Sequence, residues 1–160
     1  MNGRCVVDSA DPHGVLPGEN HNCPAGSPAG AHNIVGFTLP EAPPNKVALN
    51  AQYAFKFDEG KLTLSVSGVW KDATYGEIFN SPLNLAPSYY TVNLRAVWDD
   101  DQDRFTVIGF INNVTNTIGF DNVTQTRLGA GTSLANIALV QGVGITAPLV
   151  VGGEIQFRFR

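Results

Sequence analysis

The sequence has few charged residues and no long apolar run, and each absence excludes a class of protein. Asp, Glu, Lys and Arg make up 15% of the 160 residues, and the formal net charge is −4 at pH 7. Proteins that bind nucleic acids carry a basic patch, so this charge balance argues against such a function. No stretch reaches the roughly 18 consecutive apolar residues that indicate a membrane-spanning helix.

Cysteine is also scarce, because the chain has only Cys5 and Cys23, both within a segment rich in turn-forming residues. A disulfide in such a loop would indicate an oxidising compartment. The first residues, "MNGRCVVDSADPHG", lack the basic and apolar regions of an export signal. These two observations conflict, and one resolution is that the sequence is part of a longer protein.

No arrangement of residues typical of catalysis or metal binding is present. The three histidines, His13, His21 and His32, lie in the turn-rich first segment without the spacing of a metal site. The acidic run "DDDQD" (99–103) lacks the glycine and the distant glutamate of a calcium-binding loop, and it is typical of a solvated turn. We therefore expect no enzymatic activity, no metal and no cofactor.

What the sequence does contain is glycine, proline and apolar residues that recur at every second position. This period of two is the pattern of β-strands with two unlike faces. It predicts strands over 46–57, 61–70, 90–98, from 104 onward, and 149–159. Residues 1–44 and 113–147 are predicted to be mostly irregular; "HNIVGFTL" could hold a short strand, and "SLANIALVQGVGI" a short helix or strand.

The apolar faces of these strands fit either a soluble sandwich, where they form the core, or a membrane barrel, where they face lipid. Short acidic turns join the first strand to the second and the third to the fourth, whereas the other connections are long. Large aromatic residues lie near the strand ends: Tyr53, Phe55, Phe57, Trp98, Phe105, Phe157 and Phe159 by the short turns, and Trp70, Tyr75, Phe79, Tyr89, Tyr90 and Phe120 by the long loops. Loop asymmetry and two aromatic bands favour the barrel.

Four features occur in an order that resembles TonB-dependent outer-membrane receptors. They are the cysteine pair ahead of the first strand, "LPEAPPNKVALNAQYAF" (39–55), "APSYYTVNLRAVWDDDQDRFTVIGFINNVTN" (86–116) and the final "GGEIQFRF" (152–159). Arg160 departs from the pattern, since the family usually ends at the aromatic residue. The plug domain and most of the barrel have no counterpart, so no ligand-binding or energy-coupling residues are carried over.

The resemblance implies an all-β fold, an antiparallel β-meander of about five strands forming the C-terminal part of a transmembrane β-barrel, with long loops on one edge. Residues 1–44 would be an extracellular loop segment and residues 45–160 the barrel strands. The intact family imports siderophores, cobalamin or carbohydrates across the outer membrane of Gram-negative bacteria. Implied partners are outer-membrane lipid, the rest of the barrel and plug, the TonB complex through that plug, and the barrel-assembly machinery, which would recognise Phe157 and Phe159.

Four sets of site residues follow as expectations. Cys5 and Cys23 should be bridged in an extracellular loop, the alternative being two free thiols in a disordered tail. The residues expected to face lipid are Val47, Leu49, Tyr53, Leu62, Leu64, Val66, Val92, Leu94, Val107, Ile155 and Phe157. On the opposite strand faces, a hydrogen-bonded barrel wall is expected, formed by Asn50, Gln52, Lys56, Arg95, Glu154 and Arg158. Asn113 and Asn122, each in an "NVT" triplet, are expected to be ordinary strand-end and loop residues. The competing interpretation of the whole chain is a small secreted β-sandwich of the carbohydrate-binding type.

Overall fold

A computed structural model of the chain describes residues 5–7, 22–28, 30–128 and 138–159. These residues form an all-β fold of antiparallel strands, with one short 3-10 helix, η1 (Pro82–Asn84). Among them, no helix combines the length and the apolar character needed to cross a membrane.

The chain is divided into two compact units. Unit 1 comprises Met1–Pro44, Asp72–Pro87 and Phe120–Ile145, and unit 2 comprises Asn45–Lys71, Ser88–Gly119 and Thr146–Arg160. The junction after Pro44 coincides with the boundary expected from the sequence. Unit 1, however, also takes up two later segments that the sequence interpretation assigned to the strand region.

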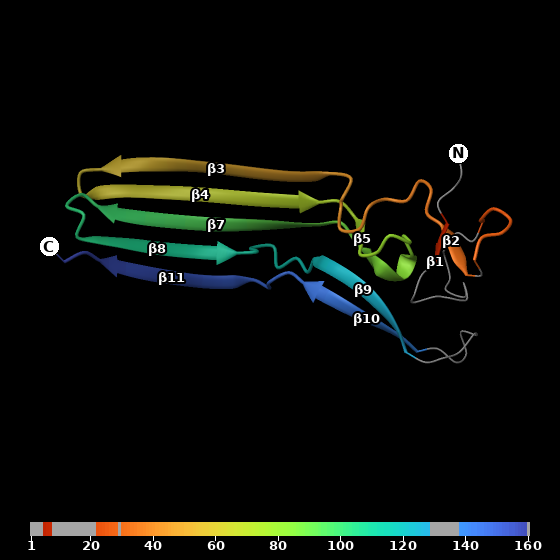
Figure 1. The fold of residues 1–160 in the computed structure, drawn as a ribbon. Coiled ribbons are helices and arrows are strands. Elements are labelled where there is room, and N and C mark those ends of the chain that lie inside the picture. The colour runs from red at the N-terminus through yellow and green to blue at the C-terminus, as the bar shows by residue number, and fades with distance from the viewer. Residues whose placement is uncertain (1–4, 8–21, 29, 129–137, 160) are drawn as a thin grey trace. The chain divides into compact units, whose positions relative to one another are not determined.

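Unit 2 is a single five-stranded sheet in the order β11-β8-β7-β4-β3 (Figure 1). Its strands are β3 (Lys46–Phe57), β4 (Gly60–Lys71), β7 (Tyr89–Asp100), β8 (Phe105–Asn112) and β11 (Val150–Phe157). All four neighbouring pairs are antiparallel. The predicted five-stranded antiparallel meander is therefore confirmed, with strand ends within two residues of those expected from the alternation.

The two short turns are built by their own residues. Between β3 and β4, Phe57 pairs with Gly60 across a two-residue turn. A Cβ on Gly60 would lie 2.3 Å from the carbonyl oxygen of Asp99, so this position accepts only glycine. Between β7 and β8, Asp103 adopts a left-handed conformation with φ of 55°, which aspartate tolerates better than most residues.

Unit 1 contains short strands and one longer hairpin. Strand β1 (Cys5–Val7) pairs with β2 (Ala31–Asn33), and β5 (Thr74–Tyr75) pairs with β6 (Leu85–Ala86). Strands β9 (Phe120–Leu128) and β10 (Ala138–Ile145) form an antiparallel pair. Among the residues of unit 1 whose side chains the structure describes, the buried hydrophobic ones are Ala31, Phe79, Ala86 and Val123.

Unit 1 corrects several expectations. Residues 113–147 were expected to be largely irregular, yet β9 and β10 form a ladder of eight residue pairs there. The undecided "SLANIALVQGVGI" contains a strand, β10, whereas "HNIVGFTL" contributes only its first two residues to β2. The β9 sequence "FDNVTQTRL" has polar residues at both alternating sets of positions, so no apolar period marked it as a strand.

Candidate functional site

The register of the unit 2 sheet places two chemically different faces back to back. Residues directly opposite each other in an antiparallel pair point to the same side. Because Tyr53 pairs with Leu64, Val66 with Leu94, and Ile155 with Val107, apolar residues align from strand to strand. The resulting apolar face carries all eleven residues that the sequence predicted to face lipid: Val47, Leu49, Tyr53, Leu62, Leu64, Val66, Val92, Leu94, Val107, Ile155 and Phe157.

The apolar face is exposed. Leu49 retains 70% of its accessible surface, Phe157 64% and Ile155 60%. Of the eleven residues, only Leu62 and Val92 are half-buried. Soluble monomers seldom expose a contiguous apolar surface of this extent, and such surfaces mark contact with a membrane or another protein.

Aromatic side chains delimit the apolar face at both ends. At one end Trp70 pairs with Tyr90, and at the other Trp98 pairs with Leu62 and its ring centroid lies 5.7 Å from that of Phe57. Along β4, positions 62 and 70 are about 26 Å apart at the usual rise of a strand. The tilt of barrel strands would reduce this span to about 20 Å, close to the apolar band of an outer-membrane barrel, which is about 25 Å.

Four aromatic residues do not follow the predicted bands: Tyr75 and Phe120 belong to unit 1, Tyr89 lies on the polar face of the sheet, and Phe79 is buried. Phe79 was expected at the membrane interface, but it belongs to unit 1, retains 8% of its surface, and packs its ring 5.1 Å from that of buried His32. Spacing along the sequence placed Phe79 near a strand end. Its burial depends on the fold of the long connections, which carry no simple period.

The opposite, polar face of the sheet contains a hollow of about 740 Å³. Two rows of residues cross it: Gln52, Ser65, Arg95 and Phe110 lie side by side on successive strands, and Asn50, Ser67 and Asn93 form the adjacent row. Asn112 and three apolar residues, Ala51, Val66 and Leu94, complete the lining. Asn50, Gln52 and Arg95 were expected on a hydrogen-bonded inner wall.

Within the hollow, hydrogen bonds link only some of the polar groups. The Asn93 amide donates to Ser67 Oγ at 3.4 Å, and its Oδ1 accepts from the Asn113 N–H at 2.8 Å. The Ser65 hydroxyl donates to the Arg95 carbonyl at 3.4 Å. Among the residues that the structure describes, the exposed guanidinium of Arg95 has no carboxylate partner. The hollow therefore presents free hydrogen-bond donors.

At the end of the sheet beyond Trp98, ion pairs order the turn between β7 and β8. Arg104 Nε donates to Asp100 Oδ2 at 2.7 Å and Nη2 donates to Oδ1 at 2.8 Å, a bidentate pair. These bonds lower the pKa of Asp100 to about 2, and they raise the pKa of Arg104. Arg158, which was expected on the inner wall, donates to Asp103 Oδ1 at 3.2 Å and to the hydroxyl of Thr106, a residue of the polar face, at 3.5 Å.

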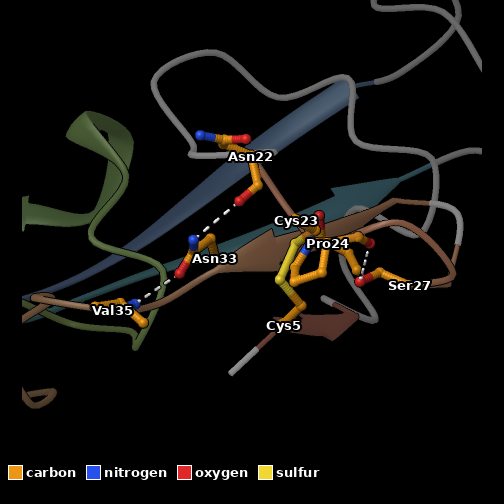
Figure 2. Close-up of a disulfide and its surroundings, with 8 residues drawn as sticks. Cys5, Asn22, Cys23, Pro24, Ser27, Asn33 and Val35 are labelled. Atoms are coloured by element: carbon orange, nitrogen blue, oxygen red, sulfur yellow. Dashed lines mark hydrogen bonds between the residues drawn. A yellow bond between two sulfur atoms is a disulfide. The ribbon is translucent and has the colours of Figure 1, made fainter. Parts of the chain in front are cut away.

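The disulfide predicted from the sequence is present in unit 1. Cys5 and Cys23 are joined, with their Cα atoms 6.0 Å apart (Figure 2). The bridge ties β1 to the segment that leads into β2. Nearby, Asn33 Nδ2 donates to the Asn22 carbonyl at 2.9 Å, and Asn33 Oδ1 accepts from the Val35 N–H at 3.0 Å. Short polar contacts thus order this segment beside the bridge.

Asn113 is a structural residue that the sequence interpretation treated as an ordinary strand end. It is buried and left-handed, with φ of 51°. Its amide donates to the carbonyls of Thr117 and Ala147, each at 2.9 Å, and its Oδ1 accepts from the Thr117 N–H. Asparagine adopts a left-handed backbone conformation more readily than most other non-glycine residues. This preference is the sequence signal that could have identified the role of Asn113.

The expected absence of a metal site was based on the three histidines and the acidic run. His13 and His21 lie outside the described residues, and His32 is buried in β2. Within the described part of the chain, no group of three or more His, Cys, Asp or Glu side chains is arranged to hold a metal ion.

In comparisons with known proteins, no protein-family model, curated protein or solved structure matches this chain.

Proposed function

We propose that this chain is the C-terminal portion of a TonB-dependent receptor of the outer membrane, supplying barrel wall and extracellular loops. The receptor would import a scarce ligand of the siderophore, cobalamin or carbohydrate class, and this portion would perform no catalysis. The observation that carries the proposal is the continuous, exposed apolar face of the unit 2 sheet, bounded by aromatic residues at both ends. The order of the sequence motifs supports the assignment to the family of TonB-dependent receptors.

The lengths of the strands support a membrane location. β3, β4 and β7 each have 12 residues, and a tilted strand needs about 9–11 to cross the hydrocarbon core. A secreted sandwich, the competing interpretation, would need a second sheet to cover the apolar face. Unit 2, as far as the structure describes it, consists of one sheet.

The edges of the sheet support its being one arc of a larger barrel. Among the described strands, β3 and β11 each pair on one side only. In lipid, unpaired backbone groups cost several kcal/mol each, so spanning sheets are closed. In the proposed receptor both edges pair with strands of the remaining barrel, and the plug fills its interior. Phe157 and the 94% exposed Phe159 would be read by the barrel-assembly machinery at the end of β11.

The two tryptophans of the chain provide the test, because both lie on the apolar face, at opposite ends. Trp98→Phe leaves Trp70 as the only tryptophan, and Trp70→Phe leaves Trp98. Each variant is made in the complete receptor, whose other tryptophans are replaced by phenylalanine, and is incorporated into vesicles whose lipids carry bromine either near the headgroups or at the bilayer centre. We expect blue-shifted emission that is quenched most strongly by the shallow bromine for both residues.

Emission that no brominated lipid quenches, together with a monodisperse protein that unfolds cooperatively without detergent, would reject the membrane location in favour of the sandwich. Quenching of one tryptophan only would mean that the strands do not cross the bilayer. Replacing Phe159 with alanine in the complete receptor tests the assembly signal, and the expected result is a lower abundance in the outer membrane.

A further inference from the structure

Arg95 is an exposed basic residue in the middle of the polar face of the unit 2 sheet. It lies on β7, and both neighbouring strands belong to the structure: Ser65 of β4 lies opposite Arg95 on one side and Phe110 of β8 on the other. Among the described strands, only β3 and β11 have an edge at which a strand of the remaining barrel can pair. A group from outside this sheet therefore reaches the Arg95 side chain only from above the polar face.

The two acidic residues at strand positions of the polar face have other partners than Arg95. Asp99 forms an ion pair with Lys61 at 3.4 Å between Oδ2 and Nζ. Glu154 accepts a hydrogen bond from the side-chain amide of Gln156 at 2.8 Å, and it lies on β11, two strands or about 10 Å from β7 at the usual strand spacing. Within the described part of the chain, the guanidinium of Arg95 thus has no carboxylate partner.

The polar face as a whole carries an excess of positive charge, although the full chain has a net charge of −4. Lys46 lies directly opposite Lys71, and Lys56 lies directly opposite Lys61. Like charges at directly opposite positions destabilise a sheet. With Arg95, these four lysines outnumber the two acidic residues of the face, so the charge of the face is not balanced within the sheet. A covering surface of negative charge would relieve the repulsion.

Under the proposed function, the polar face is turned toward the interior that the plug fills. Covering a charged side chain with protein removes its water, and this is strongly unfavourable unless an opposite charge pairs with it. Arginine cannot avoid this cost by becoming neutral, since it stays protonated in proteins. Its planar guanidinium matches a carboxylate, which accepts two parallel hydrogen bonds from it. The plug is the part of the receptor that can bring a carboxylate to Arg95.

We infer that the plug carries an aspartate or glutamate that pairs with Arg95, and that the plug surface facing this arc of the barrel is acidic. The inference rests on the proposed function, in which the plug fills the interior, and it specifies the chemistry of the surface that the polar face binds. Arg95 is the residue that positions the plug against β4, β7 and β8.

The first test locates the carboxylate by cross-linking within the complete receptor. Arg95→Lys places an amine at this position. A carbodiimide activates a carboxylate, which the amine attacks to form an amide bond while the reagent leaves as a urea. We expect mass spectrometry of the digested receptor to show residue 95 joined to an aspartate or glutamate of the plug. Gln52→Lys, in the same row on β3, is the control and should couple to that carboxylate at least about fivefold less, because it lies about 10 Å away.

The second test measures whether the charge of Arg95 holds the plug in place. In the complete receptor, Arg95→Gln should raise the hydrogen-exchange rate of the plug segment that carries the partner at least about tenfold, because the carboxylate then stays buried without its pair. Arg95→Glu should raise it further, since it places two negative charges together. Exchange in β4 and β8 should not change.

The matched control for the second test is Lys46→Gln, which also removes one positive charge from the polar face. Lys46 lies about 20 Å along the strand direction from the row that contains Arg95. It should change the exchange rate of that plug segment by less than about twofold, because charges separated by more than the screening length interact weakly. Arg95→Glu combined with arginine in place of the cross-linked carboxylate should restore slow exchange.

Three results would overturn the inference: coupling of residue 95 to no carboxylate of the plug, equal effects of Arg95→Gln and Lys46→Gln on plug exchange, or no restoration by the charge swap. The cross-link decides the matter if Arg95→Gln does not assemble, because Arg95→Lys keeps the positive charge. In each of these cases, quenching of both Trp70 and Trp98 by shallow bromine would leave the proposed function standing. Absence of that quenching would reject the proposed function and the inference together.

Discussion

The two units of this chain expose and bury opposite kinds of side chain. Unit 2 exposes large apolar residues along one face of its sheet, and its order comes from five long strands paired in register. Unit 1 buries polar residues: His32, Ser81 and Asn84 are fully buried, whereas its buried apolar residues include two alanines. A soluble domain normally stabilises itself by burying apolar surface, and neither unit follows that pattern.

The difference indicates two sources of stability. In unit 2 the backbone ladder is complete inside the sheet, and the apolar face gains free energy only when lipid or another apolar partner removes it from water. In the described part of unit 1, a disulfide and short polar contacts accompany a small set of buried apolar residues, as in many small disulfide-bonded domains. The comparison yields four predictions.

The largest effect is expected on the apolar face of unit 2. Val66→Arg places a charge in the middle of β4, where the protein faces lipid under the proposed function, and it should cost about 2–4 kcal/mol in vesicles. Ser67→Arg is the matched control, because the next residue lies on the polar face. Urea unfolding of the complete receptor in vesicles, carrying one substitution or the other, measures the difference; equal losses would mean that the two faces have similar surroundings.

The second effect concerns unit 1. Cys5→Ser with Cys23→Ser removes a bridge between residues 18 positions apart, and the loss should be about 3 kcal/mol on the chain-entropy model. Hydrogen exchange should then show faster exchange at β1 and β2, with no change in β4 and β7. Faster exchange throughout the unit 2 sheet would mean that the two units do not draw their stability from separate sources.

A third effect lies inside unit 2. Asn113→Ala removes a buried side chain that donates to the carbonyls of Thr117 and Ala147 and accepts from the Thr117 N–H, so it should cost about 1–3 kcal/mol. Asn122, in an identical "NVT" triplet but exposed on β9, is the matched control and should change stability by less than about 0.5 kcal/mol when replaced by alanine. Similar losses in chemical unfolding of both variants would contradict the role given to Asn113.

The smallest effect is a pH dependence of the β7–β8 turn. The pKa of Asp100 is lowered to about 2 by hydrogen bonds from Arg104, so the folded state favours the ionised carboxylate. Its contribution to stability is complete above the ordinary aspartate pKa of about 4 and is lost as the pH falls toward 2. Asp100→Asn should remove this part of the acid dependence of urea unfolding, and Arg104→Gln, which removes the charged donor, should reduce it as well.

The accuracy of the predictions made from the sequence also differs between the two units. The alternation in "KVALNAQYAFKF" predicted the bounds of β3 to the residue. Successive side chains of a strand point to opposite faces, so a regular alternation of apolar and polar residues fixes which residues share a face. Strand β9 was missed because its residues are polar on both sides. The buried positions of Phe79 and Asn113 were missed because each depends on contacts with residues far away in the sequence.

The sequence by itself determined the five strands of unit 2, their antiparallel order and which residues share a face, because all of these follow from local periodicity and short turns. Only the tertiary structure decided that Phe110 covers Gly152, that Arg95 lies among amides without a carboxylate, and that Arg158 pairs with Asp103. Those relations join different strands. The register between neighbouring strands determines which of these residues meet, and no pattern within one strand contains that information.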